Sequence, residues 1–253
     1  MLRDMLEFDQ AHSAALKSLW FLGDVHGDFR HIAQALLDAS KTPCWLVFLG
    51  DIDIDHKPFR EILEPMRRNF PSVQVAFIHG NHDADTHEHW AMLHDCGDAL
   101  ALHGRVLDLE GVRVAGLGGN FMGRIWSPPA QATFQNKEEA MRPGPYSWRD
   151  GERPSSMLSA CIYPSDLAAL SKLRADILVT HEAPSCHPHG FGALDELARS
   201  MRVVRTFHGH HHDDLSHEYA KVRKEICFDA RAVSYCSIKN GLGEIVVNGP
   251  QGW

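Results

Sequence analysis

Five short polar motifs occur along this sequence, and each one comes after a run of apolar residues. In chain order they are Gly23-Asp24-Val25-His26-Gly27, Gly50-Asp51, Gly80-Asn81-His82-Asp83, Thr180-His181-Glu182 and Gly209-His210-His211-His212. Their carboxylate, amide and imidazole groups are the side chains that hold divalent transition metals. Two such ions held close together activate water for attack on phosphorus. The motifs therefore predict a metal-dependent hydrolase of phosphoesters.

The spacing within the motifs selects seven side chains as candidate metal ligands. Asp24 and His26 are two residues apart and can point the same way. His210 and His212 repeat this spacing, which leaves His211 facing elsewhere. The complete set of candidates is Asp24, His26, Asp51, Asn81, His181, His210 and His212.

Asp51 is the candidate for a carboxylate shared by two metal ions. Two dications close together repel each other, and an anionic oxygen between them offsets that repulsion. The mixed nitrogen and oxygen set suits Mn, Fe, Zn or Ni better than Ca, which prefers oxygen ligands alone. We expect two divalent ions, with Mn as the expected metal. His82 is next to Asn81, so it is predicted to lie in the pocket without serving as a ligand.

Apolar runs that alternate with amphipathic segments predict the elements that position these motifs. The expected strands are Leu19–Leu22, Trp45–Leu49, Val73–Ile78, Val112–Leu117, Ile177–Thr180 and Val203–Phe207. The expected helices are Phe29–Ala39, Pro58–Arg68, Asp166–Leu173 with Ser165 as N-cap, and Ala193–Met201. This alternation is typical of parallel sheet with helices outside. Because ligands collect beyond the carboxyl ends of such strands, we expect the motifs to meet there.

The last part of the sequence has a different pattern. Asn240-Gly241 is a strong turn signal between the apolar segments Ala232–Ile238 and Glu244–Val247, which predicts a β-hairpin. Glycines at the starts of the motifs, including Gly80 and Gly209, are expected to let the backbone approach the site closely.

Composition limits the class of protein. Hydrophobic residues make up 44% of the 253 residues, and the formal net charge is -8. This charge argues against a surface that coats nucleic acid. Residues 1–20 do not form a secretory signal, and no run of roughly 18 apolar residues occurs, so no membrane partner is expected. Six cysteines without CxxC spacing fit a reducing compartment. We expect one cytoplasmic domain over residues 1–253, and the oligomeric state is not predicted.

Residues 120–157 fit neither the strand nor the helix pattern. The segment contains five prolines and has weak periodicity. A long irregular segment in a compact domain is either functional or disordered, and we interpret this one as a flap beside the site. Arg124, Arg149 and Arg153 are its candidate substrate-binding residues, because an arginine can bind a second phosphate. A solvated, loosely packed loop is the alternative.

In their order and spacing, the five motifs resemble the signature of the calcineurin-like metallophosphoesterase superfamily, which runs D-x-H, G-D, G-N-H-D/E, H and G-H-x-H. The resemblance spans residues 24–212. It implies an α/β fold with four layers, α/β/β/α, built on two mixed sheets. It also implies that Asp24, His26, Asp51 and His212 hold one metal, and that Asp51, Asn81, His181 and His210 hold the second. His82 would donate to the phosphate and help the leaving oxygen take a proton.

The sequence also shows some resemblance to serine/threonine protein phosphatases and diadenosine tetraphosphate hydrolases, but it departs from both. Their acid and arginine after the shared aspartate are Ile54 and Asp55 here, and their arginine before G-N-H is His79. The usual phosphate-clamping arginines are therefore absent at these positions. Asp53 or Asp55 is the candidate acid partner of His82, through a shifted turn. The stretch from His181 to Pro184 is more similar to the smaller bacterial phosphoesterases.

The first hypothesis is a hydrolase of phosphate mono- or diesters, in which two metals generate the attacking hydroxide and the substrate is a small molecule or a nucleotide. A protein phosphatase is the alternative enzyme, disfavoured by Asp55 and His79. A nuclease would need a basic groove, which the charge does not suggest. A non-catalytic scaffold with the same fold is the alternative of another class, although such proteins typically lose ligands and all seven are present here.

Overall fold

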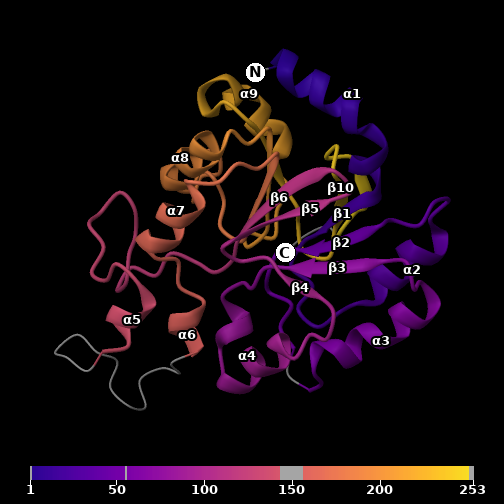
Figure 1. The fold of residues 1–253 in the computed structure, drawn as a ribbon, viewed down its shortest axis with the longest axis horizontal. Coiled ribbons are helices and arrows are strands. Elements are labelled where there is room, and N and C mark those ends of the chain that lie inside the picture. The colour runs from indigo at the N-terminus through magenta and orange to yellow at the C-terminus, as the bar shows by residue number, and fades with distance from the viewer. Residues whose placement is uncertain (1, 55, 143–155, 251–253) are drawn as a thin grey trace.

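In the computed structural model, which describes residues 2–54, 56–142 and 156–250, the strands form two mixed sheets (Figure 1). The first has the order β11-β10-β1-β2-β3-β4 and the second the order β5-β6-β7-β8-β9. In the first sheet the strands are β1 (Leu19–Leu22), β2 (Trp45–Phe48), β3 (Gln74–Phe77), β4 (Leu100–Ala101), β10 (Ile238–Asn240) and β11 (Ile245–Val247). In the second they are β5 (Arg105–Leu109), β6 (Val112–Leu117), β7 (Ile177–Thr180), β8 (Arg205–His208) and β9 (Asp229–Ala232).

Parallel pairing dominates both sheets. It joins β1, β2, β3 and β4 in the first sheet and β6, β7, β8 and β9 in the second. Strands β10 and β5 pair antiparallel with β1 and β6, and β11 pairs antiparallel with β10. The parallel strands of each sheet therefore end at a common edge.

Alternating side chains of β1 show how the layers stack, because successive residues of a strand face opposite sides of a sheet. Trp20 and Leu22 pack into the core beneath the helices, whereas Leu19 and Phe21 pack into the core between the two sheets. Across that inner core Phe21 stacks on Phe207 with ring centroids 4.0 Å apart. The two sheets therefore pack face to face.

Helices cover the outer face of each sheet, as Figure 1 shows. Over the first sheet lie α2 (Arg30–Asp38), α3 (Phe59–Asn69) and α4 (His87–His94), and over the second lie α7 (Pro164–Leu170), α8 (Gly192–Met201) and α9 (Ser216–Ile226). Leu36 and Leu63 bury the apolar faces of α2 and α3, and Leu197 and Tyr219 do so for α8 and α9. The predicted helix–sheet–sheet–helix order is confirmed.

Two details of the predicted elements are wrong. Helix α7 begins at Pro164 with Tyr163, not Ser165, at the N-cap, because the Asp166 carboxylate accepts the Tyr163 N–H at 2.8 Å. The C-terminal hairpin exists, but Ala232 ends β9 in the other sheet, and only Ile238–Asn240 pairs with β11. Between Ala232 and Ile238 the chain crosses from the second sheet to the first, whereas the sequence pattern predicts one continuous strand there.

The segment at 120–157 is partly organised around a small core of its own. It contains α5 (Lys137–Ala140) and the start of α6 (Ser156–Ser159), which lie at one edge of the molecule (Figure 1). Ile125, Ala140, Leu158, Cys161 and Tyr163 pack together there. Residues 143–155, with Arg149 and Arg153, lie outside the described residues.

Helix α1 (Leu2–Ser18) precedes the first strand and was not predicted from the sequence. It buries Leu16 in the core between the sheets. Neither α1 nor any other helix of the described chain combines the length and the apolar character needed to cross a bilayer.

A buried arginine connects α1 to both sheets. Arg205 of β8 is 1% exposed and donates to Asp9 of α1, to Asp229 of β9 and to the carbonyl of Gly241 after β10. The distances are 3.1, 2.8 and 2.7 Å, so each guanidinium nitrogen involved has a close acceptor. Asp229 is itself 1% exposed.

Arg205→Ala is expected to lower the free energy of unfolding by about 3 kcal/mol, because it breaks a buried salt-bridge network. Asp229 keeps Arg223 and Arg231 as partners, whereas the half-buried Asp9 and the Gly241 carbonyl lose the hydrogen bonds that Arg205 donates. Denaturant unfolding measures the change. Arg105→Ala, at an exposed position of β5, is the control, with an expected effect within about 0.5 kcal/mol. Equal effects of the two substitutions would contradict the role assigned to Arg205.

Candidate metal centre

The first group of candidate ligands is Asp24, His26 and His212, whose ligand atoms all lie within 4.8 Å of one another. His26 Nε2 is 3.1 Å from His212 Nε2, and His212 Nε2 is 3.4 Å from Asp24 Oδ2. Asp24 comes two residues after β1 and His212 four residues after β8. This group therefore joins loops from both sheets.

The second group is Asp51, His181 and His210, again within 4.8 Å. Asn81 adjoins it, because its Oδ1 is 3.0 Å from His181 Nε2. The same nitrogen is 3.4 Å from Asp51 Oδ2. These residues follow β2, β3, β7 and β8, so four strand ends supply the group.

Asp51 lies between the two groups. Its Oδ2 is 3.4 Å from His181 Nε2 in one group and 4.0 Å from His26 Nε2 in the other. Its Oδ1 accepts the backbone N–H of His82 at 2.9 Å. The structure thus brings all seven predicted ligands into one cluster, with Asp51 in the position expected of a shared carboxylate.

The backbone around the cluster leaves no room for side chains at two motif glycines. A Cβ on Gly80 would lie 2.2 Å from Asp51 Oδ1, and one on Gly209 would lie 2.4 Å from Asp24 Oδ1. His26, Asp51 and His212 adopt left-handed φ angles of 41°, 45° and 59°. Such angles cost a non-glycine residue roughly 1–2 kcal/mol each, and strain of this kind is typical of functional sites.

Hydrogen bonds on the far side of two imidazoles orient them toward the cluster. His181 Nδ1 lies 2.9 Å from the carbonyl oxygen of Leu49, which can only accept, so Nδ1 carries a proton and Nε2 faces the ligand group. Burial lowers the pKa of His181, but the Asp51 and Asp24 carboxylates outweigh it and raise the pKa to about 10, so a bound cation would displace the proton on Nε2. His26 Nδ1 lies 3.4 Å from Asp53 Oδ2, and its Nε2 faces His212. Both rings are therefore held with Nε2 toward the cluster.

The electrostatics of the cluster fit bound cations. Asp24 and Asp51 are 0% and 1% exposed, and Asp24 Oδ1 accepts no hydrogen bond from any described residue. Burial raises the pKa of Asp24 to about 7. Burial also opposes ionisation of Asp51, but His181 and the His82 N–H outweigh it and hold the pKa of Asp51 below its usual range. Divalent cations would compensate these buried carboxylates.

The neutral form of His210 suits the same purpose. Burial lowers the pKa of His210 to about 3, and the neighbouring His181 adds to this effect. A neutral imidazole keeps the lone pair that a metal needs. His211 faces away from the cluster and stacks on His187 with ring centroids 3.8 Å apart, as the spacing predicts.

His82 lies at the edge of the cluster without being part of either ligand group. Its ring centroid is 5.6 Å from that of His26, and its side chain is 48% exposed. Its Nδ1 is 2.8 Å from Asp85 Oδ2. Burial lowers the pKa of His82, but the Asp85 and Asp51 carboxylates outweigh it and raise the pKa above its ordinary value.

The acid beside His82 is neither Asp53 nor Asp55, the two candidates predicted from the sequence. Asp85 lies there, because the 3-10 turn η1 (His82–Ala84) brings residue 85 back to the ring. Asp53 lies instead beside His26 and, at 3.7 Å, beside His89 Nδ1. Asp55 lies outside the described residues. The available sequence signal for Asp85 was its position two residues after the G-N-H-D motif.

Three further residues support the site and were not singled out from the sequence. Glu182 is 4% exposed, accepts the Phe121 N–H at 3.0 Å and has Oε2 3.9 Å from His210 Nε2. Burial raises its pKa to about 7. Asp83 accepts the N–H groups of Gly80 and Asp53 at 2.8 and 2.7 Å, which ties two ligand loops together. Glu182 and Asp83 occur within the motifs, so their positions there were the available signal.

Tyr235, the third of these residues, lies beside the first ligand group. Its ring centroid is 5.4 Å from that of His212 and 5.8 Å from that of His26. It comes from the crossing between β9 and β10, and no sequence signal marks it. Arg124 is exposed in the loop after Phe121. Because the Phe121 N–H binds Glu182, that loop begins next to the cluster.

Asp53→Asn is expected to weaken metal binding by about 10–100-fold, because it removes the carboxylate that orients His26. Calorimetric titration of metal-free protein with Mn measures the affinity. Asp38→Asn, at an exposed position of α2, provides the matched control and is expected to bind as tightly as the wild type. A wild-type affinity in Asp53→Asn would exclude the orienting role.

The chain is similar in sequence to known proteins. The profile of the calcineurin-like phosphoesterase family matches residues 17–214. An uncharacterized protein of Haemophilus influenzae is 35% identical over 200 residues, which cover 78% of this chain and 84% of that protein.

Among solved structures, the protein TT1561 of Thermus thermophilus has a TM-score of 0.52 at 13% identity, over 88% of this chain and 94% of that one. The likeness supports the fold alone. A 5'-nucleotidase from Candida albicans has a TM-score of 0.40 at 16% identity, over 88% of this chain and 46% of that one. From the family match over most of its length, we conclude that the chain belongs to the calcineurin-like phosphoesterase family.

Proposed function

We propose that this protein hydrolyses phosphate mono- or diesters at a centre of two divalent metal ions. The observation that carries the proposal is the position of Asp51 between two groups of ligand atoms. One ion would be held by Asp24, His26, Asp51 and His212, and the other by Asp51, Asn81, His181 and His210. Mn is the expected metal, with Fe, Zn or Ni as alternatives that the donor set also accepts.

When bound, the ions supply Lewis acidity and lower the pKa of water toward neutrality. The protein's own groups then perform three tasks. Buried Asp24 and Asp51 provide the negative charge that keeps two cations close together. Leu49 and Asp53 hold the imidazoles of His181 and His26 in their binding orientation.

The third task is proton transfer to the leaving oxygen, which we assign to His82. Asp85 stabilises the protonated imidazole through Nδ1. The other ring nitrogen, Nε2, is then free to donate its proton to the departing alkoxide. General acid help of this kind contributes roughly 10²–10⁴-fold to the rate.

The family supports a small phosphorylated substrate, and we propose a phosphorylated metabolite or a nucleotide rather than nucleic acid. We also propose that residues 1–253 form a single cytoplasmic domain in which the segment at 120–157 borders the site. The Phe121–Glu182 hydrogen bond supports this placement of the segment. A serine/threonine protein phosphatase remains the alternative enzyme, tested with phosphopeptides.

Metal removal and reconstitution test the proposal. Protein stripped with a chelator is expected to be inactive on p-nitrophenyl phosphate and bis(p-nitrophenyl) phosphate. Reconstitution with Mn is expected to restore hydrolysis of at least one of them and to load two ions per chain, measured by elemental analysis. A reconstituted protein that binds metal but hydrolyses neither ester nor any phosphopeptide or nucleotide would instead support a non-catalytic scaffold.

A further inference from the structure

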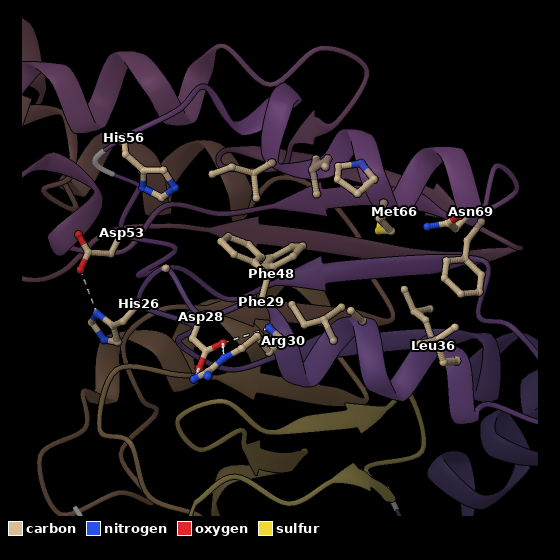
Figure 2. A pocket seen from close by; sticks show the side chains of 18 residues that line it. His26, Asp28, Phe29, Arg30, Leu36, Phe48, Asp53, His56, Met66 and Asn69 are labelled. Carbon is tan, nitrogen blue, oxygen red and sulfur yellow. Dashed lines mark hydrogen bonds and ion pairs between the residues drawn. The ribbon is translucent and has the colours of Figure 1, made fainter.

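A groove of about 800 Å³ opens between α2 and α3 and has the candidate ligand His26 at one end (Figure 2). Its volume lies within the range of small-molecule sites. His26 and Asp53 line one end of the groove, and His26 is also a candidate metal ligand. Buried Phe48 of β2 contributes to the lining between the two helices. The groove therefore borders the candidate metal centre at His26.

The chemistry of the lining changes along the groove. At the metal end, Figure 2 shows His26, Asp53 and His56 on one side, with the paired side chains of Asp28 and Arg30 nearby. The far end is lined by aliphatic and aromatic groups, including Leu36, Leu37, Met66 and Phe70, with the amide of Asn69 as a polar group.

The far end is also open to solvent. Leu37 is 70% exposed, which leaves a large apolar side chain in water at the groove. Exposed apolar surface that adjoins a polar site is typical of ligand binding. The distance from Arg30 to Leu37 along α2 is about 10 Å, at 1.5 Å per residue. An occupant that reaches from the metals to Leu37 must therefore be extended.

We propose that the groove binds an aliphatic chain on the substrate, so that the preferred substrate is a phosphoester with an extended apolar tail. This inference rests on the proposed function, because it places the phosphate at the metal centre and the tail between α2 and α3. The polar end of the groove then meets the phosphate, and the apolar end buries the tail.

A nucleobase fits the far end less well. A base carries several hydrogen-bond donors and acceptors, each costly to bury without a partner. At the far end, the amide of Asn69 can form hydrogen bonds with a base, and the other lining side chains named here are aliphatic or aromatic. An aliphatic chain has no such requirement, and it gains from every methylene that leaves water.

A series of ethyl, butyl, hexyl and octyl phosphates tests the proposal with Mn-loaded enzyme, alongside the matching alkyl p-nitrophenyl phosphates for diesterase activity. Full burial of a methylene raises affinity about fourfold. Because the groove is open on one side, each methylene is expected to raise kcat/KM about twofold. The octyl ester has six more methylenes than the ethyl ester, so its kcat/KM is expected to be roughly 60-fold higher. A flat series would overturn the inference while leaving phosphoesterase activity intact.

Two substitutions with matched controls locate the effect. Leu37→Asp places a charge in the groove. Its control, Leu173→Asp, places a charge at an exposed leucine that does not line the groove. Ala33→Phe fills the groove from α2, and Ala168→Phe adds the same ring to an exposed position of α7. Leu37→Asp and Ala33→Phe are expected to reduce the octyl-to-ethyl ratio at least about tenfold, and the controls are expected to preserve it.

Binding to metal-free protein separates the two proposals. Calorimetry at several temperatures is expected to show octylphosphonate binding more tightly than ethylphosphonate, with a negative heat capacity change. Leu37→Asp is expected to weaken the octyl compound alone. Failure of the phosphoesterase proposal would leave this result unchanged, whereas equal binding of the two phosphonates would overturn the groove assignment.

Two other occupants would give different outcomes. Two results together would overturn the aliphatic assignment. The enzyme would hydrolyse a nucleoside monophosphate faster than octyl phosphate, and Leu37→Asp would change hydrolysis of the nucleotide no more than Leu173→Asp does. A wild-type dimer in sedimentation that Leu37→Asp alone dissociates, together with a flat ester series, would show that the groove holds a second copy of the chain.

Discussion

Asp51→Asn is expected to lower the rate of phosphoester hydrolysis more than about 100-fold. This exceeds the roughly 10–100-fold loss that follows removal of a residue that only orients a ligand. The side chain is 1% exposed and has one oxygen near ligand atoms of both groups. Asparagine preserves the volume but supplies no negative charge. Two cations would then repel each other without the compensation that the carboxylate provides. The metal content is expected to fall below two ions per chain.

Elemental analysis and turnover, measured on the same preparation, test this expectation. Asp38→Asn makes the same chemical change at an exposed position of α2 and is expected to retain both metals and activity. Thermal unfolding confirms that each variant is folded. Retention of two ions per chain by Asp51→Asn would contradict the shared-carboxylate assignment, whatever its activity.

His82→Ala is expected to reduce turnover of alkyl esters about 10²–10⁴-fold while leaving the metal content unchanged. The imidazole is not part of either ligand group. The contact that His82 makes with Asp51 comes from its backbone N–H, and alanine retains this donor. Loss of the imidazole therefore removes the proton donor without removing a ligand or its hydrogen bond.

The leaving group provides a readout that distinguishes acid catalysis from a structural role. A p-nitrophenolate leaves without needing a proton, so the defect of His82→Ala is expected to shrink with p-nitrophenyl esters relative to alkyl esters. Asp85→Asn is expected to show the same trend at a smaller size, because Asp85 acts through His82. His217→Ala, at an exposed histidine, is the control. An equal defect for both leaving groups would contradict the acid role.

The strands and helices next to the motifs followed from local pattern alone. Strands β1, β6 and β7 begin and end at the predicted residues, because each is a short apolar run bounded by polar or glycine residues. The close approach at Gly80 and Gly209 was also predictable, since a glycine beside a ligand motif indicates a backbone near side chains. These features depend on neighbours in the sequence.

Features that depend on distant contacts were not predictable in the same way. Asp85 and Asp53 are both near motif residues in the chain, and only the turn at His82–Ala84 decided which carboxylate meets His82. Arg205 is a charged residue within a fully buried strand, and its burial is explained only once Asp9, far away in the chain, is placed beside it.

The sequence by itself determined the donor chemistry of the site, because the types of the seven side chains and their spacing within each motif are local properties. Tertiary structure decided which of these side chains come together in each ligand group, and that a groove runs from His26 between α2 and α3. The physical reason is that convergence and empty space arise from the packing of whole layers. No single segment of the chain contains that information.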